Sequence, residues 1–287
     1  MPRLEITLGR IALGAIVALA LAFLFLPLVA VFVAVPPARA LADLTSPIAV
    51  AALGLSLRTT FESVAVTILF GTPLAYWLSR SRFRGKRLLE AAVQMPIVVP
   101  PAVAGVGLLL VFGRRGMLGP ALESIHLGVA FTTAAVVIAQ AFVAGPFFIV
   151  AARQAFDAID PDLVAVSRTL GASPLRTFVA IELPLAAGGL LAGAALSWAR
   201  ALGEFGATML FAGNLPGVTQ TLPLAIYTAL DSGLDVAVAM AALLLFAAFA
   251  LLLLIRLLDW RMGREAAPHR REETLDIARL PISQASS

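Results

Sequence analysis

The sequence has 287 residues, of which 60% are hydrophobic and 13% are charged, with a formal net charge of +4 and no cysteine. This apolar content exceeds what a soluble globular domain buries and is typical of a polytopic membrane protein. The lack of cysteine excludes disulfides, thiolate metal sites and cysteine nucleophiles. Because the basic residues flank the apolar segments, we expect membrane lipids rather than nucleic acid as partners.

Six apolar segments predict an all-α integral membrane protein with six transmembrane helices, since about 20 apolar residues are enough to cross a bilayer. We divide the chain into an N-terminal helix with its outer loop (1–56), a core transmembrane domain (57–260) and a polar tail (261–287) that we expect to be disordered. The six segments are 11–35, 58–79, 91–112, 129–151, 185–212 and 234–258.

The first apolar segment, 11–35, has two interpretations. Arg3 and Arg10 precede it and Ala38-Arg39-Ala40 follows it, as in a cleaved secretory signal peptide. However, the segment is about twice as long as the usual signal core of roughly 7–15 residues, which favours a retained first span. The mass of the mature protein would distinguish these interpretations.

The distribution of basic residues predicts the orientation. Cytoplasmic loops of membrane proteins collect Lys and Arg. The segment 80–87 holds five basic residues, Arg168 and Arg176 lie within 160–184 and Arg153 lies shortly before it, whereas the loops on the other side hold few. We therefore expect both termini and the segment 160–184 to be cytoplasmic.

A proline cluster interrupts the third apolar segment. Pro96, Pro100 and Pro101 lie within six residues, and proline bends a helix because it lacks an N–H and clashes with the preceding turn. Membrane helices tolerate such bends where neighbouring groups satisfy the backbone. An ordinary helix bend is one interpretation, and a distortion that serves as a gate is the other.

The longest polar interruption, 160–184, has the pattern of two short helices joined by a glycine. Asp160 and Ser173 are typical N-caps, each followed by proline at the first helical position. Gly171 suits the left-handed residue that ends a helix, and Pro184 marks the next expected break. Leu163, Val166 and Leu170 fall on one face of the first helix, which favours docking onto a soluble partner.

The fifth apolar segment combines small and charged residues. Gly189 and Gly193 permit close helix packing, either within the chain or between copies of it. Arg200 and Glu204 lie four residues apart and so pair on one helix face. Charges inside a membrane usually face a cavity or each other, so this pair either fixes the helix or lines a polar pathway.

A second capped helix start follows on the outer side. Thr219, Gln220 and Thr221 precede Leu222-Pro223, and we expect a short helix from there to about Ala229. The hydroxyl and amide donors at such a helix start suit a passing oxyanion. An ordinary outer-loop helix is the alternative interpretation.

The sequence lacks the motifs of several chemistries. It contains neither a P-loop nor HExxH, and neither histidine, His126 nor His269, lies in an apolar segment. We therefore predict no catalytic residue, no metal site and no cofactor bound by this chain. If the protein moves a solute, its energy is expected to enter through 160–184.

The segment 160–184 resembles the EAA loop of bacterial ABC-importer permeases. Gly171, nine further residues and then Ile181-Glu182-Leu183-Pro184 match its pattern, but Ala165-Val166-Ser167 stands where the family usually has Glu-Ala-Ala. The resemblance implies a loop that couples the permease to an ATPase. The residues expected in this coupling role are Asp162, Leu163, Val166, Arg168, Leu170, Gly171, Ala172, Ser173, Ile181, Leu183 and Pro184.

Other stretches are similar to the molybdate/tungstate permease subfamily. These are residues 82–87, 96–101, 200–208, 212–217 and 219–227. Sulfate permeases share the stretch 200–208 in similar form, so a sulfate or other anion permease is the alternative within this architecture. The residues expected in a translocation pathway or gate are Arg200, Glu204, Pro100, Pro101, Thr219, Gln220 and Thr221.

The resemblance implies a type I importer in the bacterial cytoplasmic membrane. Two copies of the permease would assemble with a cytoplasmic ABC ATPase dimer and an extracytoplasmic oxyanion-binding protein. ATP and magnesium would be bound by the ATPase, so this chain itself is not an enzyme. A non-transporting membrane scaffold and an intramembrane enzyme are the remaining alternatives, which the intramembrane charges and the missing catalytic motifs respectively disfavour.

Overall fold

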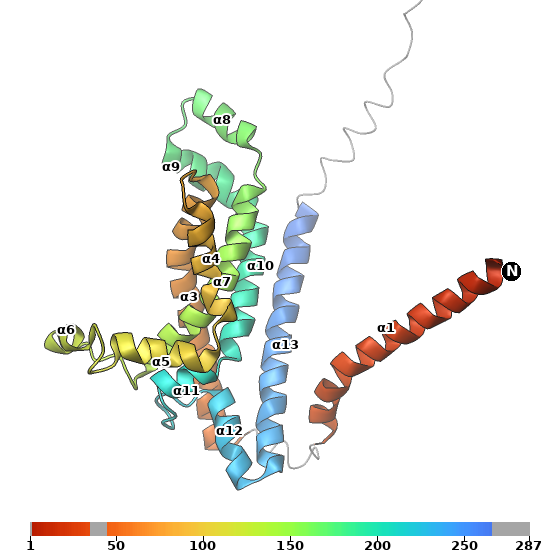
Figure 1. Cartoon of the computed structure of the whole chain (residues 1–287), viewed down its shortest axis with the longest axis vertical. Helices are drawn as coiled ribbons and strands as arrows, with labels where there is room; N and C mark the ends of the chain where they lie inside the picture. Colours follow the sequence, from red (N-terminus) through yellow and green to blue (C-terminus); the bar gives the residue numbers. More distant parts are fainter. Residues whose placement is uncertain (1, 35–44, 266–287) are drawn as a thin grey trace, which may run out of the picture.

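The computed structural model describes residues 2–34 and 45–265, and within these ranges every regular element is a helix. Most long helices run side by side in one bundle, whereas α5 and α6 lie across it and α1 leans away from it (Figure 1). The prediction of an all-α protein is confirmed. The helices are α1 (Pro2–Val33), α3 (Pro47–Arg80), α4 (Lys86–Val98), α5 (Pro101–Phe112), α6 (Gly119–Ser124), α7 (Thr133–Asp157), α8 (Pro161–Thr169), α9 (Pro174–Thr177), the π-helical turn η1 (Phe178–Glu182), α10 (Leu183–Leu202), α11 (Gly206–Phe211), α12 (Leu222–Ser232) and α13 (Leu234–Glu265).

Five stretches of helix in the described ranges are long and apolar enough to cross a membrane. The bent pair α4 and α5 makes a sixth where it is counted as one span, in agreement with the six predicted segments. Helix α7 packs against α3, α4 and α10 and so lies at the centre of the bundle. The five stretches are Ala12–Val33, Pro47–Arg80, Thr133–Asp157, Pro174–Leu202 and Leu234–Leu254.

The third predicted span, 91–112, is not one helix. Helices α4 and α5 meet at an angle of 111°, so the expected distortion is a complete break. Val99 and Pro100 both adopt extended backbone conformations between the two helices. The physical reason is the pair Pro100-Pro101, because each proline pushes the residue before it out of the helical region.

The fifth predicted span, 185–212, has different ends in the structure. The predicted break at Pro184 is wrong, because one helical stretch runs from Pro174 through η1 into α10. The π-helical turn just before Pro184 shifts the backbone carbonyl groups that the proline ring would otherwise meet. The helix can therefore continue through the proline without a break. At the other end, α10 stops at Leu202 and the short helix α11 follows it after a break.

Two further helix ends differ from the predicted ones. Helix α3 begins at Pro47, with the Ser46 side chain capping its first turn, so it starts before the expected boundary at 57. Helix α13 continues to Glu265, past the expected end at 258. The Ala38-Arg39-Ala40 motif and the tail beyond Glu265 lie outside the described residues.

The small residues of α10 pack within the chain. A β-carbon on Gly189 would lie 2.4 Å from Cβ of Ala155, and one on Gly193 would lie 2.9 Å from Cβ of Ala151. Both alanines belong to α7, so the two glycines let α10 approach α7 closely. Of the two interpretations offered by the sequence, packing within the chain is the one that the structure shows.

We expect Gly189→Leu to destabilise the bundle by about 1–3 kcal/mol, the usual cost of forcing extra volume into a packed helix contact. Thermal unfolding of the purified protein in detergent would measure this change. Gly188→Leu is the matched control, because nothing lies within 4 Å of a β-carbon placed there. Equal shifts in melting temperature for the two variants would contradict this packing.

Candidate functional site

The segment 160–184 forms the predicted short helix α8 and the predicted turn at Gly171, but its second helix, α9, continues through η1 into α10. Asp160 accepts a hydrogen bond from the backbone N–H of Asp162 (2.9 Å), which caps α8. Gly171 adopts φ +86°, and the backbone N–H of Ala172 donates to the carbonyl of Ser167 (3.1 Å). This is the hydrogen bond of a glycine-ended helix. The Ser173 side chain then caps α9.

One buried hydrogen bond holds the two short helices together. The hydroxyl groups of Ser167 on α8 and Thr177 on α9 lie 3.0 Å apart, and both side chains are buried. Ser167 belongs to the stretch Ala165-Val166-Ser167, in which this chain departs from the family pattern. No local pattern predicts this contact, because it joins two helices across the turn at Gly171.

The apolar face of this loop has no partner within the described residues. Leu163, Val166 and Leu170 on α8 are all exposed, with 82% of Leu170 accessible, and Leu175 on α9 is 72% exposed. The loop projects from one end of the bundle (Figure 1). The predicted apolar face therefore lies where a soluble protein can reach it, and exposed apolar patches of this kind mark interaction sites.

The other residues expected in the coupling role have different surroundings. Asp162, Arg168 and Ser173 are exposed on the loop beside the apolar face. Pro184 is exposed too, in the first turn of α10. Three residues are partly buried and so contribute to how the loop is seated on the bundle: Ala172, Ile181 and Leu183.

A buried charge at the base of the loop was missed by the sequence analysis. Glu182 in η1 is fully buried, and its carboxylate accepts hydrogen bonds from Arg80 (2.5 Å) and Tyr76 (2.8 Å), both on α3. The available signal was an acidic residue inside the apolar motif that ends in Pro184. Its partners lie about a hundred residues earlier in the chain, so no local pattern identifies them.

Two interrupted helices meet at the other end of the bundle. The break between α4 and α5 lies near Pro101, and the break between α10 and α11 lies near Gly206. A β-carbon on Gly206 would lie 2.9 Å from Cβ of Pro101, and one on Gly105 would lie 2.9 Å from the carbonyl oxygen of Ala207. Helices α5 and α11 therefore pack backbone to backbone, which brings the predicted gate residues Pro100 and Pro101 to this contact.

The predicted pair of Arg200 and Glu204 forms at the second break. The Arg200 Nη2 lies 2.7 Å from the Glu204 Oε2, and the glutamate side chain is 1% exposed. The other carboxylate oxygen accepts the backbone N–H of Ala207 (2.9 Å). Glu204 thus caps α11 as well as pairing with Arg200, so the pair stabilises the interruption itself.

The three polar residues before α12 are packed inside the protein. Thr219, Gln220 and Thr221 are all buried. The Thr219 hydroxyl accepts the backbone N–H of Leu215 (2.9 Å), and the first N–H of α12, from Leu222, is donated to Ser56 of α3. The first contact closes the loop on itself, and the second fixes the start of α12 to α3. A role for the three side chains in anion passage stays a prediction.

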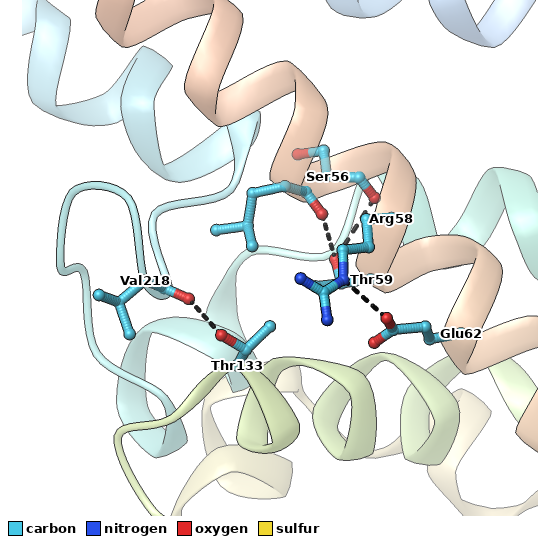
Figure 2. Close-up of polar contacts among 7 residues, drawn as sticks. Ser56, Arg58, Thr59, Glu62, Thr133 and Val218 are labelled. Atoms are coloured by element: carbon cyan, nitrogen blue, oxygen red, sulfur yellow. Dashed lines mark hydrogen bonds and ion pairs between the residues drawn. The ribbon is translucent and has the colours of Figure 1, made fainter.

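A charged pair on α3 was also missed as a candidate. Arg58 Nε lies 2.8 Å from Glu62 Oε1, and the two side chains are 70% and 43% exposed (Figure 2). Nearby, Thr133 on α7 donates a hydrogen bond to the carbonyl of Val218 (2.9 Å) (Figure 2). A charge exposed to lipid costs about 2.5–3.5 kcal/mol at mid-membrane, so we infer that this pair faces water or protein.

Residues 68–264 match the protein family described as the binding-protein-dependent transport system inner membrane component. This match spans most of the chain and includes the coupling loop and both interrupted helices. The chain belongs to this family. As a binding-protein-dependent inner membrane component, it is a multi-pass protein of the cytoplasmic membrane and a transport subunit.

Curated relatives of this inner membrane component are named as molybdenum permeases. The molybdenum transport system permease protein ModB of Mycobacterium bovis is 42% identical over 79% of this chain and 86% of its own length. A putative molybdenum transport system permease protein of Bacillus subtilis, YvgM, is 48% identical over 62% of this chain and 79% of its own length.

A solved structure has the same fold as this inner membrane component. It is a bacterial alginate ABC transporter in complex with an alginate pentasaccharide-bound periplasmic protein. The two chains are 18% identical, with a TM-score of 0.67 over 91% of this chain and 95% of that one. At this identity the likeness establishes the fold of a type I ABC importer permease and nothing about the substrate.

Proposed function

We propose that this protein is the membrane-spanning permease of an ABC importer that carries molybdate or tungstate into the cell. The identity of 42% with a molybdenum permease over most of both chains is the observation that carries the choice of substrate. The exposed apolar face of α8 supports the coupling role, because a loop that projects from a membrane bundle needs a soluble partner to cover it.

The proposed assembly contains two copies of this chain, a cytoplasmic ABC ATPase dimer and an extracytoplasmic oxyanion-binding protein. The ATPase supplies the sites for ATP and magnesium, and the sequence of this chain has no P-loop to bind them. The binding protein delivers the anion to the face opposite the 160–184 loop. This arrangement agrees with the orientation expected from the basic residues.

The coupling loop drives the proposed transport cycle. Closure of the ATPase dimer on ATP displaces the loop, and the loop displaces the helices to which it is attached. A conformational change is driven only if the ligand binds one state more tightly than the other. ATP must therefore favour one arrangement of the two permease copies, and its hydrolysis allows the return to the other.

A sulfate permease of the same architecture is the second candidate. The stretch 200–208, which contains Arg200 and Glu204, is similar to the corresponding stretch of sulfate permeases. In the structure these two residues pair with each other at the break between α10 and α11, so they give no preference between tetrahedral dianions.

Uptake into liposomes tests the proposal. The permease would be reconstituted with its ATPase and binding protein, and accumulation of molybdate, tungstate and sulfate would be measured with and without ATP. We expect ATP-dependent uptake of molybdate and tungstate, and much slower uptake of sulfate. Preferential uptake of sulfate would support the second candidate, and no ATP-dependent uptake of any of the three would contradict both.

Replacing Pro96, Pro100 and Pro101 together by alanine should impair this uptake. Each proline disfavours a continuous helix by about 3 kcal/mol, so the triple variant favours a straight third span and removes the bend that places α5 against α11. The measurement is the rate of molybdate uptake. Pro27→Ala in α1 is the control, since that proline lies inside a helix that stays unbroken. Unchanged uptake by the triple variant would contradict a gating role for the break between α4 and α5.

A further inference from the structure

The base of the coupling loop contains an ion pair whose glutamate, Glu182, is buried and has both carboxylate oxygens hydrogen-bonded. The two carboxylate oxygens of Glu182 take different partners on α3: Oε1 bonds Arg80 and Oε2 bonds Tyr76. Glu182 lies only a few residues beyond the end of α9, and Arg80 is the last residue of α3. The contact therefore ties the loop directly to a helix other than the one that continues its own chain.

Three aromatic rings, one of them that of Tyr76, pack against one another beside this ion pair. The ring of Tyr76 lies 4.7 Å from Phe178 of η1 and 5.3 Å from Phe156 of α7, and the two phenylalanine rings are 6.1 Å apart. Such contacts favour defined ring orientations. Together with the ion pair they attach η1 to both α3 and α7.

The element held in this way is the π-helical turn that interrupts regular α-helical hydrogen bonding between the loop and α10. A π-helical turn is rare and usually occurs at functional sites or where a helix bends. If η1 were attached only through its own chain, a displacement of α8 and α9 would bend this turn. The buried contacts to Arg80 and Tyr76 oppose that bending, because an unpaired carboxylate cannot be left in an apolar interior at low cost.

We propose that Glu182, Arg80 and Tyr76 form a joint that passes displacement of the coupling loop to α3, so that α3 moves together with α10. In this role the three are positioning residues, since they act through the helices that they join. The charged pair of Arg58 and Glu62 lies in the first half of α3, which ends at Arg80, so the joint links the ATPase side of the bundle to that pair. This role rests on the proposed function.

Glu182→Gln and Tyr76→Phe test the joint with minimal changes of shape. We expect both variants to assemble with the ATPase and to hydrolyse ATP at close to the normal rate. The number of anions taken up per ATP hydrolysed should fall at least about fivefold for Glu182→Gln, and less for Tyr76→Phe, which keeps the ion pair. Glu123→Gln, in the exposed pair with Arg114, is the control and should leave this ratio unchanged.

A distance measurement separates this role from a merely structural one. Because the chain has no cysteine, a single spin label can be placed at exposed Leu69 on α3 or at exposed Leu196 on α10, and the distance between the two copies measured with and without ATP and vanadate. In the parent complex we expect both distances to change on trapping. In Glu182→Gln we expect the change at Leu69 to be largely lost while that at Leu196 remains.

The outcomes distinguish the joint from the proposed function. The joint would be overturned if Glu182→Gln took up the normal number of anions per ATP hydrolysed, or if its inter-copy distance at Leu69 changed as in the parent. ATP-dependent uptake by the parent complex would still support the proposed function in that case. A variant that loses yield and thermal stability but keeps the normal ratio would show a purely structural pair. Absence of ATP-dependent uptake by the parent complex would overturn the proposed function and the joint with it.

Discussion

Replacing Arg200 by alanine should destabilise the protein by about 3–5 kcal/mol, the cost of leaving a buried charge without its partner. Glu204 is 1% exposed and also holds the first turn of α11. Its unpaired carboxylate would seek water or a proton, and the break between α10 and α11 would lose its defined shape. Thermal unfolding and the yield of assembled complex would measure the effect on stability, and molybdate uptake the effect on function.

The exposed pair on α3 provides the matched control for stability. Arg58 and Glu62 have the same spacing and a similar separation of 2.8 Å, but both side chains are well exposed. Pairs of this kind contribute about 0–1 kcal/mol, so Arg58→Ala should change the melting temperature little. If Arg200→Ala were as stable as Arg58→Ala, the pair at the break would be dispensable for the fold.

Valine at Gly171 should uncouple ATP hydrolysis from transport. The residue has φ +86°, and a β-branched side chain there would strain the backbone by about 1–3 kcal/mol. Since nothing lies within 4 Å of a β-carbon at this position, the strain comes from the backbone alone. We expect ATP hydrolysis to continue while uptake per ATP falls at least about fivefold, because the angle between α8 and α9 changes.

Two variants control for the backbone effect. Gly171→Asn should keep most of the coupling, since asparagine tolerates the left-handed conformation better than other residues. Gly217→Val introduces a similar strain at φ +73° in the loop before α12, again with open space around the β-carbon, and should leave the coupling ratio intact. Normal coupling in Gly171→Val would contradict the role of the turn.

The features that were predicted correctly depend on residues close together in the sequence. The N-cap at Asp160, the turn at Gly171 and the pair of Arg200 with Glu204 all arise from spacings within one or two helical turns. Such signals act before the chain packs, so the pattern itself is sufficient. The transmembrane segments were predicted for the same reason, since hydropathy is a local property.

The features that were missed depend on contacts between distant parts of the chain. Glu182 accepts a hydrogen bond from Arg80, which lies 102 residues earlier in the chain. The first N–H of α12 donates a hydrogen bond to Ser56, which lies 166 residues earlier. The continuous path through Pro184 was also missed, because the sequence does not show that a π-helical turn precedes it. Packing selects these features, so no single stretch of sequence predicts them.

The docking of the 160–184 loop on a soluble ATPase has one direct test. A cysteine replaces either exposed Val166 on the apolar face of α8 or exposed Leu196 on α10, and a short bifunctional reagent is applied to the assembled, transport-active complex. We expect Val166→Cys to cross-link to the ATPase and Leu196→Cys not to do so. An intact, active complex in which Val166→Cys gives no cross-link to the ATPase would contradict the coupling role of this loop.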